Sequence, residues 1–143
     1  MPIRPELRWL YPIDWPILSR RIRFDRARGR CESCGRPHGT RLWQLADGRW
    51  LDPLTGIWRD DDGRPSAWPD LVHWASGRER WILLGVAHLD HDPTNNRPRN
   101  LQALCQRCHL RHDRPEHLRR RRLRRLARRA LGDLFGGPYP EPP

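Results

Sequence analysis

Four cysteines constrain the fold of this 143-residue chain more than any other feature. They form two Cys-x2-Cys pairs, Cys31/Cys34 and Cys105/Cys108, and no cysteine is left over. Two such pairs supply the four thiolates that a tetrahedral zinc ion binds. Seventy residues separate the pairs, so a shared zinc ion would join distant parts of the chain. Because four protein ligands leave no open position on the metal, we expect this zinc to be structural.

The composition indicates one small domain stabilised partly by metal. Apolar residues make up 36% of the sequence, which limits the size of a hydrophobic core. No segment is long enough and apolar enough to span a membrane, and the first residues lack the core of a signal peptide. We therefore expect a soluble, cytoplasmic protein with no membrane partner, in which the thiols stay reduced and available to metal.

The charge of the chain points to nucleic acid. All 28 basic residues are arginine, and the formal net charge is +11. The planar guanidinium group donates two parallel hydrogen bonds to a phosphate, which suits it to a polyanionic backbone. The expected partner is DNA, with RNA possible.

The N-terminal part of the chain is predicted to contain an arm and a helix. Residues 1–16 hold four prolines and three aromatic residues, which favours an extended arm whose rings dock on the body of the protein. From Ile17 to Arg28 apolar residues alternate with arginines without a helix breaker, which predicts an amphipathic helix that ends at Gly29.

Residues 39–80 are predicted to form a tryptophan-rich insert of β-hairpins. Asp47-Gly48 and Asp62-Gly63 are turn signals between short apolar segments. The insert contains five tryptophans: Trp43, Trp50, Trp58, Trp68 and Trp74. We interpret these rings as the core of a small subdomain, and stacking on nucleic-acid bases stays open as the alternative.

A strand, a loop and a second strand follow the insert. The apolar run from Trp81 to Ala87 predicts a buried strand. If the strand continues to Asp90, its period of two places His88 and Asp90 on the same face. The loop 92–99 is dense in turn-forming residues and leads to a second apolar segment, Asn100 to Leu104.

The C-terminal part of the chain is predicted to be a basic helix, residues 114–135, followed by a disordered tail, residues 136–143. Ten arginines lie between residues 111 and 129 against only Asp113 and Glu116, a net charge of +8. A helix face with so little balancing acid is suited to a phosphate backbone. The candidate nucleic-acid-binding residues are Arg97, Arg99, Arg119, Arg120, Arg121, Arg122, Arg124 and Arg125.

The sequence resembles the motif of the HNH endonucleases, most closely over residues 87–113. The matching residues are His88, Asn100 and His109, and the second cysteine pair lies between the last two of them. The resemblance implies an α+β fold in which residues 17–113 form a small ββα-metal (HNH, His-Me finger) core with zinc knuckles. It also implies DNA phosphodiester hydrolysis with His88 as general base, because an imidazole accepts a proton near neutral pH. Asn100 would orient the base, and His109 would bind a catalytic divalent cation such as Mg2+, Mn2+ or Ni2+.

One position departs from that family. Many HNH endonucleases carry Asp or His as a metal ligand immediately before the first histidine, where this chain has Ala87. Asp90 is the first candidate to replace that ligand, because it is predicted to share a strand face with the catalytic histidine. Asp113 is the second candidate, because it follows His109 by four residues and lies on the same helical face, and His112 is a further option.

Two other functions are compatible with the same residues. One is a non-catalytic zinc-stapled module that binds DNA or RNA, in which the histidines only form hydrogen bonds within the fold. The other is a toxin-like or defence nuclease that attacks RNA as well as DNA. Sequence specificity, nicking against double-strand cutting, and the oligomeric state are left open at this level.

Overall fold

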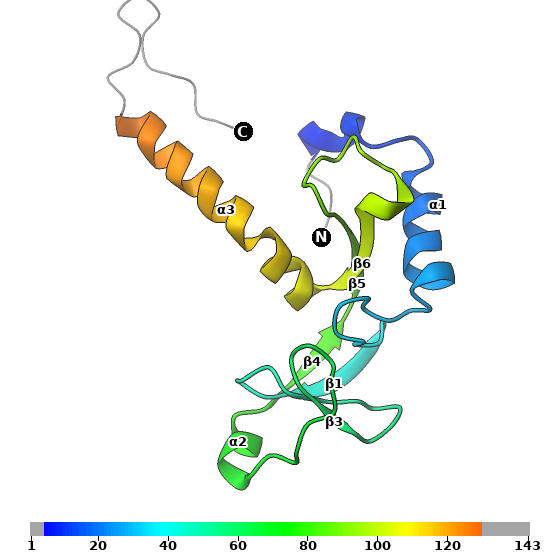
Figure 1. Ribbon diagram of the computed structural model, residues 1–143, viewed down its shortest axis with the longest axis vertical. Helices are drawn as coiled ribbons and strands as arrows, with labels where there is room; N and C mark the ends of the chain where they lie inside the picture. The colour runs from blue at the N-terminus through cyan, green and yellow to red at the C-terminus, as the bar shows by residue number, and fades with distance from the viewer. Residues whose placement is uncertain (1–4, 130–143) are drawn as a thin grey trace, which may run out of the picture. The chain divides into compact units, whose positions relative to one another are not determined.

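The strands form two antiparallel sheets (Figure 1). The structure, a computed structural model, describes residues 5–129. It divides into two compact units, residues 1–109 and 110–143. The strands all belong to the first unit and are β1 (Thr40–Gln44), β2 (Trp50–Leu51), β3 (Trp58–Arg59), β4 (Arg78–Ile82), β5 (Leu84–His88) and β6 (Leu101–Cys105). This is the mixed α+β class expected from the sequence.

The larger sheet has the strand order β3-β2-β1-β4, and β5 pairs with β6 in a separate two-stranded sheet. Only Leu83 separates β4 from β5. The predicted apolar strand is therefore present as parts of two strands, β4 in the larger sheet and β5 in the smaller one. At the junction the backbone N–H of Leu84 donates a hydrogen bond of 2.9 Å to Nδ1 of His38. The side chain of His38 thus satisfies a backbone group where the chain leaves one sheet for the other.

The end of β5 differs from the prediction. The strand stops at His88, where His88 pairs with Leu101, and Asp90 lies in the turn that follows. The expectation that Asp90 shares a strand face with His88 is therefore wrong. The period of two is broken at Leu89 and Asp90, which form a turn, and His91 adopts the left-handed conformation that turns favour, with a φ of 61°.

The N-terminal segments are helical. The predicted extended arm contains a 3-10 helix, η1 (Pro5–Leu10), which a proline at its first position favours. The predicted amphipathic helix is confirmed as α1 (Trp15–Arg20) continuing into a π-helical turn, η2 (Arg21–Arg26). It ends where Arg28 and Gly29 both adopt positive φ, 51° and 69°.

The insert confirms both predicted hairpin turns. The first joins β1 to β2, with Gly48 at φ 99°, and the second follows β3, with Gly63 at φ 88°. Gly63 abuts the backbone of Cys34 so closely that a Cβ atom would overlap it. A short helix that the sequence did not predict, α2 (Leu71–Ala75), begins where the side chain of Asp70 accepts a hydrogen bond from the backbone N–H of His73.

Two clusters of buried residues form the core of the first unit. The larger combines the four cysteines with Leu42, Trp50, Ile82, Leu84, Ala87 and Leu104. The smaller joins the N-terminal helix to β6 through Ile22, Leu101 and Ala103, and Trp15 and Leu18 pack against it. Trp50 and Trp58 are fully buried, as expected for a subdomain built around tryptophan, whereas Trp68 is 72% exposed.

The basic helix, α3 (Gln106–Arg129), begins directly after β6, earlier than predicted. Pro115 lies inside it, where its ring removes one backbone donor without ending the helix. The predicted end of the helix at residue 135 and the predicted tail, residues 136–143, lie outside the described residues. Among the described helices, none has the length and apolar character needed to cross a membrane.

Candidate metal centre and candidate active site

The four cysteine side chains converge in the larger core cluster, as the sequence predicts. Each is at most 3% exposed, and the four Sγ atoms all lie within 4.8 Å of one another. The Sγ atoms of Cys34 and Cys105 are 3.7 Å apart, and all four thiols are free of disulfides. Tetrahedral zinc with Zn–S bonds of about 2.3 Å separates its sulfur ligands by about 3.8 Å. The set fits a zinc ion.

The electrostatics of the cluster also favour a cation. Hydrogen bonds from the neighbouring thiols, that of Cys105 first, lower the pKa of Cys31 and bring the pKa of Cys34 to about 7. Hydrogen bonding with Cys108 and then with the other two thiols raises the pKa of Cys105. Four buried sulfurs this close cannot all carry negative charge without compensation, and a divalent cation supplies it.

Arg36 is a charged residue of the metal centre that the sequence reasoning missed. Its side chain is fully buried, and Nη1 donates to Sγ of Cys34 at 3.1 Å. Nη2 donates to the carbonyl of Gly48 at 2.8 Å, and the guanidinium lies 5.2 Å from the centre of the Trp50 ring. A zinc ion with four thiolates carries a net charge of −2, and Arg36 offsets part of it. The only signal in the sequence is an arginine two residues after the second cysteine of a pair.

A salt bridge ties the insert to the second cysteine pair. Arg107, between Cys105 and Cys108 in sequence, donates from Nε and Nη2 to the two carboxylate oxygens of Asp61 at 2.6 and 2.9 Å. Asp61 also lies 3.3 Å from Nη2 of Arg36. The metal centre is thus linked to the hairpin after β3 by charged groups as well as by packing.

His88 lies at the opposite end of the β5–β6 pair from the cysteines. It is 9% exposed, and its Nε2 lies 3.0 Å from Oδ1 of Asn96. The amide of Asn96 is oriented by its own Nδ2, which donates to the carbonyls of Pro93 and Thr94 at 3.2 Å. Because Oδ1 can only accept, Nε2 of His88 carries the proton and Nδ1 keeps its lone pair.

Two aromatic rings from the N-terminal segment contact the same imidazole. The Trp15 ring stacks on His88 with 5.2 Å between ring centres and 13° between planes. Tyr11 meets His88 edge-on at 5.7 Å and Trp15 at 4.9 Å. Neither ring, nor Asn96, could be assigned to the site from sequence, although docking of the N-terminal aromatics on the body was expected.

Asn100 and Asp90 together clamp the loop after His88. Asn100 Nδ2 donates to Oδ1 of Asp90 and to the carbonyl of Asn95, both at 2.8 Å, and Asn100 Oδ1 accepts from the backbone N–H of Asp90 at 3.2 Å. Asn95 Nδ2 donates to Oδ2 of Asp90 at 2.6 Å. The backbone N–H of Asp92, with the amides of Asn100 and Asn95, lowers the pKa of Asp90 to about 2. Asp90 is therefore an ionised carboxylate that already accepts the hydrogen bonds that hold the loop.

The two other predicted ligands of the catalytic cation lie on α3. His109 is half-buried, three residues after the helix begins at Gln106. Asp113, in the second unit, has an oxygen 2.9 Å from Nδ1 of His112, and both side chains are largely buried. Metal binding by His109, Asp90 or Asp113 stays a prediction.

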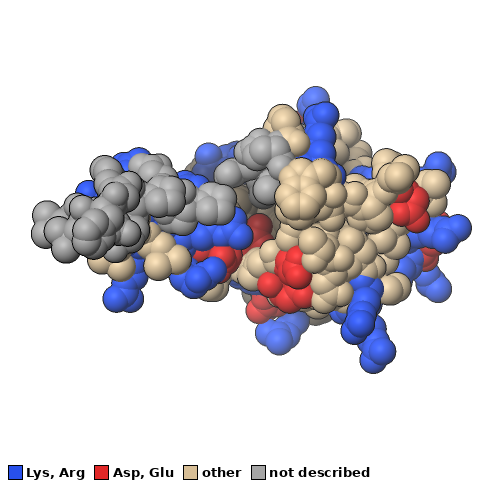
Figure 2. Space-filling view, turned by 90° about the horizontal axis from the view of Figure 1, so that it is seen from above, with Lys and Arg blue, Asp and Glu red and all other residues tan. Residues whose placement is uncertain are grey.

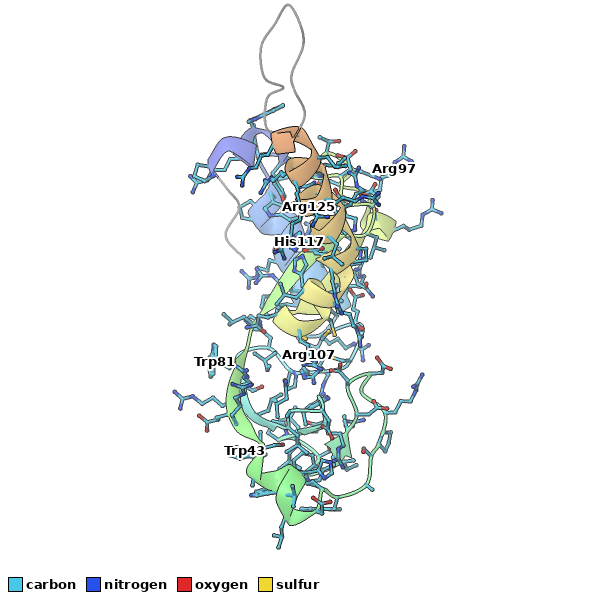
Figure 3. All side chains as sticks on the ribbon, turned by 90° about the vertical axis from the view of Figure 1, so that its left-hand side faces the viewer. Trp43, Trp81, Arg97, Arg107, His117 and Arg125 are labelled. Atoms are coloured by element: carbon cyan, nitrogen blue, oxygen red, sulfur yellow. The ribbon has the colours of Figure 1, made fainter. Side chains whose placement is uncertain are left out.

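The candidate nucleic-acid-binding arginines fall into two sets. Arg97 and Arg99 are exposed beside the short helix η3 (Pro98–Asn100), and the other six lie on α3. Glu116 binds Arg119 and Arg120 at 2.7 to 2.9 Å, and these contacts lower its pKa to about 2. The other four, Arg121, Arg122, Arg124 and Arg125, line a depression in the helix surface together with Leu118 and Arg128. Figure 2 shows arginine side chains, in blue, scattered over the face that it draws, and Figure 3 labels Arg125 on α3 and Arg97.

No protein family model matches this sequence, and no curated protein or solved structure shows significant similarity to it. A functional assignment therefore rests on the geometry of the chain's own residues.

Proposed function

We propose that the chain is a metal-dependent HNH-type endonuclease that hydrolyses DNA phosphodiester bonds with His88 as the general base. The observation that carries the proposal is the imidazole of His88, held by Asn96 at Nε2 and by an aromatic ring on one face. A general base needs a defined tautomer, because the nitrogen that takes the proton must keep its lone pair.

In the proposed reaction Nδ1 of His88 accepts a proton from the attacking water. Proton transfer to a positioned base is worth about 10²- to 10⁴-fold in rate. Asn96 keeps the proton of the free imidazole on Nε2, so that Nδ1 is the basic nitrogen. Asn100 holds the loop in which Asn96 lies, through its bonds to Asp90 and Asn95.

A divalent cation such as Mg2+, Mn2+ or Ni2+ would stabilise negative charge on the leaving 3′ oxygen. We assign His109 and Asp90 as its ligands, with Asp113 as the alternative to Asp90. The pKa of Asp90, about 2, keeps its carboxylate ionised at neutral pH. Hydrogen bonds from Asp92, Asn95 and Asn100 take up three of about four acceptor positions of that carboxylate, which leaves room for one further ligand bond.

Plasmid cleavage by the full chain tests the proposal. Supercoiled DNA is incubated with the wild-type protein and with Mg2+, Mn2+, Ni2+ or no added divalent cation. We expect metal-dependent nicking or cutting, and His88→Ala should lower the rate by about 10²- to 10⁴-fold while the chain still melts cooperatively. His73→Ala is the matched control, because His73 is exposed in α2 and contacts Asp70 rather than the site.

Two results would contradict it in different ways. If His88→Ala cuts DNA as fast as the wild type, His88 is not the general base. DNA or RNA binding without cutting under every metal would instead favour the non-catalytic zinc-stapled binding module.

The arginines of α3 are proposed to hold the DNA backbone. Replacing Arg121, Arg122, Arg124 and Arg125 together by glutamine should weaken DNA binding and flatten its dependence on salt, because each lost phosphate contact removes about 0.9 from the log–log slope. Four arginines of the first unit, Arg41, Arg64, Arg78 and Arg80, provide a control with the same change in net charge. An equal loss in both variants would mean that total charge matters rather than α3.

A further inference from the structure

The N-terminal segment contributes directly to the proposed active site. Trp15 is the first residue of α1, and its ring lies nearly parallel to the imidazole of His88, at an interplanar angle of 13°. Tyr11, four residues earlier, contacts both rings edge-on. The three rings form one aromatic cluster between the start of α1 and the end of β5.

Stacking supplies a restraint that the hydrogen bond to Asn96 does not. The torsion that turns a histidine ring about its Cβ–Cγ bond is broad, since it joins sp³ and sp² atoms. Nε2 lies nearer to the axis of that rotation than Nδ1 does, so a hydrogen bond at Nε2 limits the rotation less than a contact over the whole ring. Nδ1 lies further from the axis and moves when the ring turns. A flat ring parallel to the imidazole fixes the plane of the imidazole and hence the direction of the Nδ1 lone pair.

The position of Trp15 is itself held by the fold. Its ring packs against the smaller core cluster, which joins Ile22 of η2 to Leu101 and Ala103 of β6. Leu18, one turn further along α1, packs against the same cluster. The two side chains therefore share a structural task, and the Trp15 ring also stacks on the imidazole.

We infer that Trp15 is a positioning residue for His88: it sets the plane of the imidazole and aims Nδ1 at the attacking water. The inference rests on the proposed endonuclease function. It makes the start of α1 part of the catalytic apparatus, with Tyr11 supporting both rings from the side.

The experiment compares three variants of the full chain in steady-state cleavage of a DNA duplex, with melting temperatures measured in parallel. Trp15→Leu keeps an apolar side chain but loses the flat ring, and Trp15→Phe keeps a ring. Leu18→Ala removes packing from the same cluster and leaves the Trp15 ring unchanged. We expect Trp15→Leu to lower kcat by about 10- to 100-fold with KM unchanged, Trp15→Phe to restore most of kcat, and Leu18→Ala to lower the melting temperature but not kcat.

A second measurement does not depend on activity. Correlation NMR spectra of the histidine ring nitrogens report the tautomer and the exchange behaviour of His88. The wild type and Leu18→Ala should show one set of sharp ring signals, and Trp15→Leu should show signals broadened by exchange between ring orientations, with Nε2 still protonated because Asn96 is unchanged.

The outcomes separate the inference from the function on which it rests. If Trp15→Leu and Leu18→Ala lose kcat in proportion to their melting temperatures, or if Trp15→Leu leaves the ring spectrum of His88 unchanged, Trp15 has only a structural role. If His88→Ala cuts as well as the wild type, the proposed nuclease function fails, and the spectra still decide whether Trp15 holds the imidazole.

Discussion

The two ends of the β5–β6 pair are built in opposite ways. At one end, where Leu84 pairs with Cys105, buried sulfurs from residues seventy positions apart meet within the main core. At the other end, where His88 pairs with Leu101, a polar loop of partly exposed residues is held by asparagine and aspartate side chains. Five residue pairs along the two strands connect these ends.

The difference reflects what each end has to do. Metal ligation can hold a closed centre without solvent access, and burial then adds the packing of Leu42, Trp50 and Ile82 around it. His88 at the other end is also largely buried, at 9% exposed, but a hydrogen bond to Asn96 and stacking on Trp15 hold it in place of a metal ion. One end of the β5–β6 pair thus depends on the proposed zinc ion, and the other end depends on reversible contacts.

The largest expected effect is at the cysteine end. Cys31→Ser should abolish cooperative melting of the chain, because structural zinc contributes about 10–16 kcal/mol in small zinc-binding peptides, comparable to the whole stability of a domain at about 5–15 kcal/mol. Thermal melts with and without added zinc, together with the zinc content per chain, measure this. If Cys31→Ser melts like the wild type, the proposed four-cysteine zinc centre is wrong.

The next effect is at the histidine end and should change rate rather than stability. Asn96→Ala removes the acceptor at Nε2 of His88 and should lower the cleavage rate by about 10- to 100-fold. Asn95→Ala is the matched control, since Asn95 lies in the same loop and bonds Asp90 instead of His88. Equal losses for the two variants would mean that the loop as a whole, and not the bond to His88, supports catalysis.

A smaller effect tests the charge beside the metal centre. Arg36→Met removes the guanidinium that contacts Cys34 and leaves Asp61 paired with Arg107. We expect zinc affinity, measured by competition with a chelator, to fall by about 10- to 100-fold. Arg49→Met is the control, because Arg49 pairs with Asp47 in a turn and does not contact the sulfurs. Unchanged affinity in Arg36→Met would show that the thiolates need no counter-charge from the protein.

The smallest effect is expected at the junction between the two sheets. Burial, and then the charge of Arg23, lower the pKa of His38 below its usual value of 6.5. The unfolded chain therefore binds this proton more readily than the folded one, so stability present above pH 6.5 is lost as the pH falls through the lowered pKa. His38→Gln, which keeps an acceptor for the N–H of Leu84 but does not titrate near neutral pH, should lack this part of the dependence. Identical pH profiles from chemical denaturation would contradict the assignment.

Local patterns account for the parts of the molecule that the sequence predicted. The cysteine spacing indicated a shared cluster, and the thiols of Cys31, Cys34, Cys105 and Cys108 converge. Asp47-Gly48 and Asp62-Gly63 marked real turns, because glycine is the residue that adopts positive φ without strain. The apolar run before His88 indicated strand structure, and it forms the end of β4 and most of β5, because a short continuous apolar segment favours a strand.

The prediction failed where a residue's role depends on a neighbour distant in the chain or on a break in periodicity. Asp90 leaves the strand face because the chain turns after His88, a change that a period of two cannot represent. Arg36 is buried against sulfur only because the insert folds over it and supplies Gly48 and Asp61. Trp15 lies 73 residues before His88 and reaches it only through the docking of α1 on β6.

By itself the sequence determined which chemical groups are available and the local geometry of the segments that carry them: four thiolates in two pairs, a histidine at the end of a strand, an asparagine-rich loop and an arginine-rich helix. Only the tertiary structure decided which partners orient them. The reason is physical: a turn or a strand depends on a few neighbouring torsion angles, whereas the plane of the His88 ring depends on Trp15 and on Asn96, which only the folded chain brings to it.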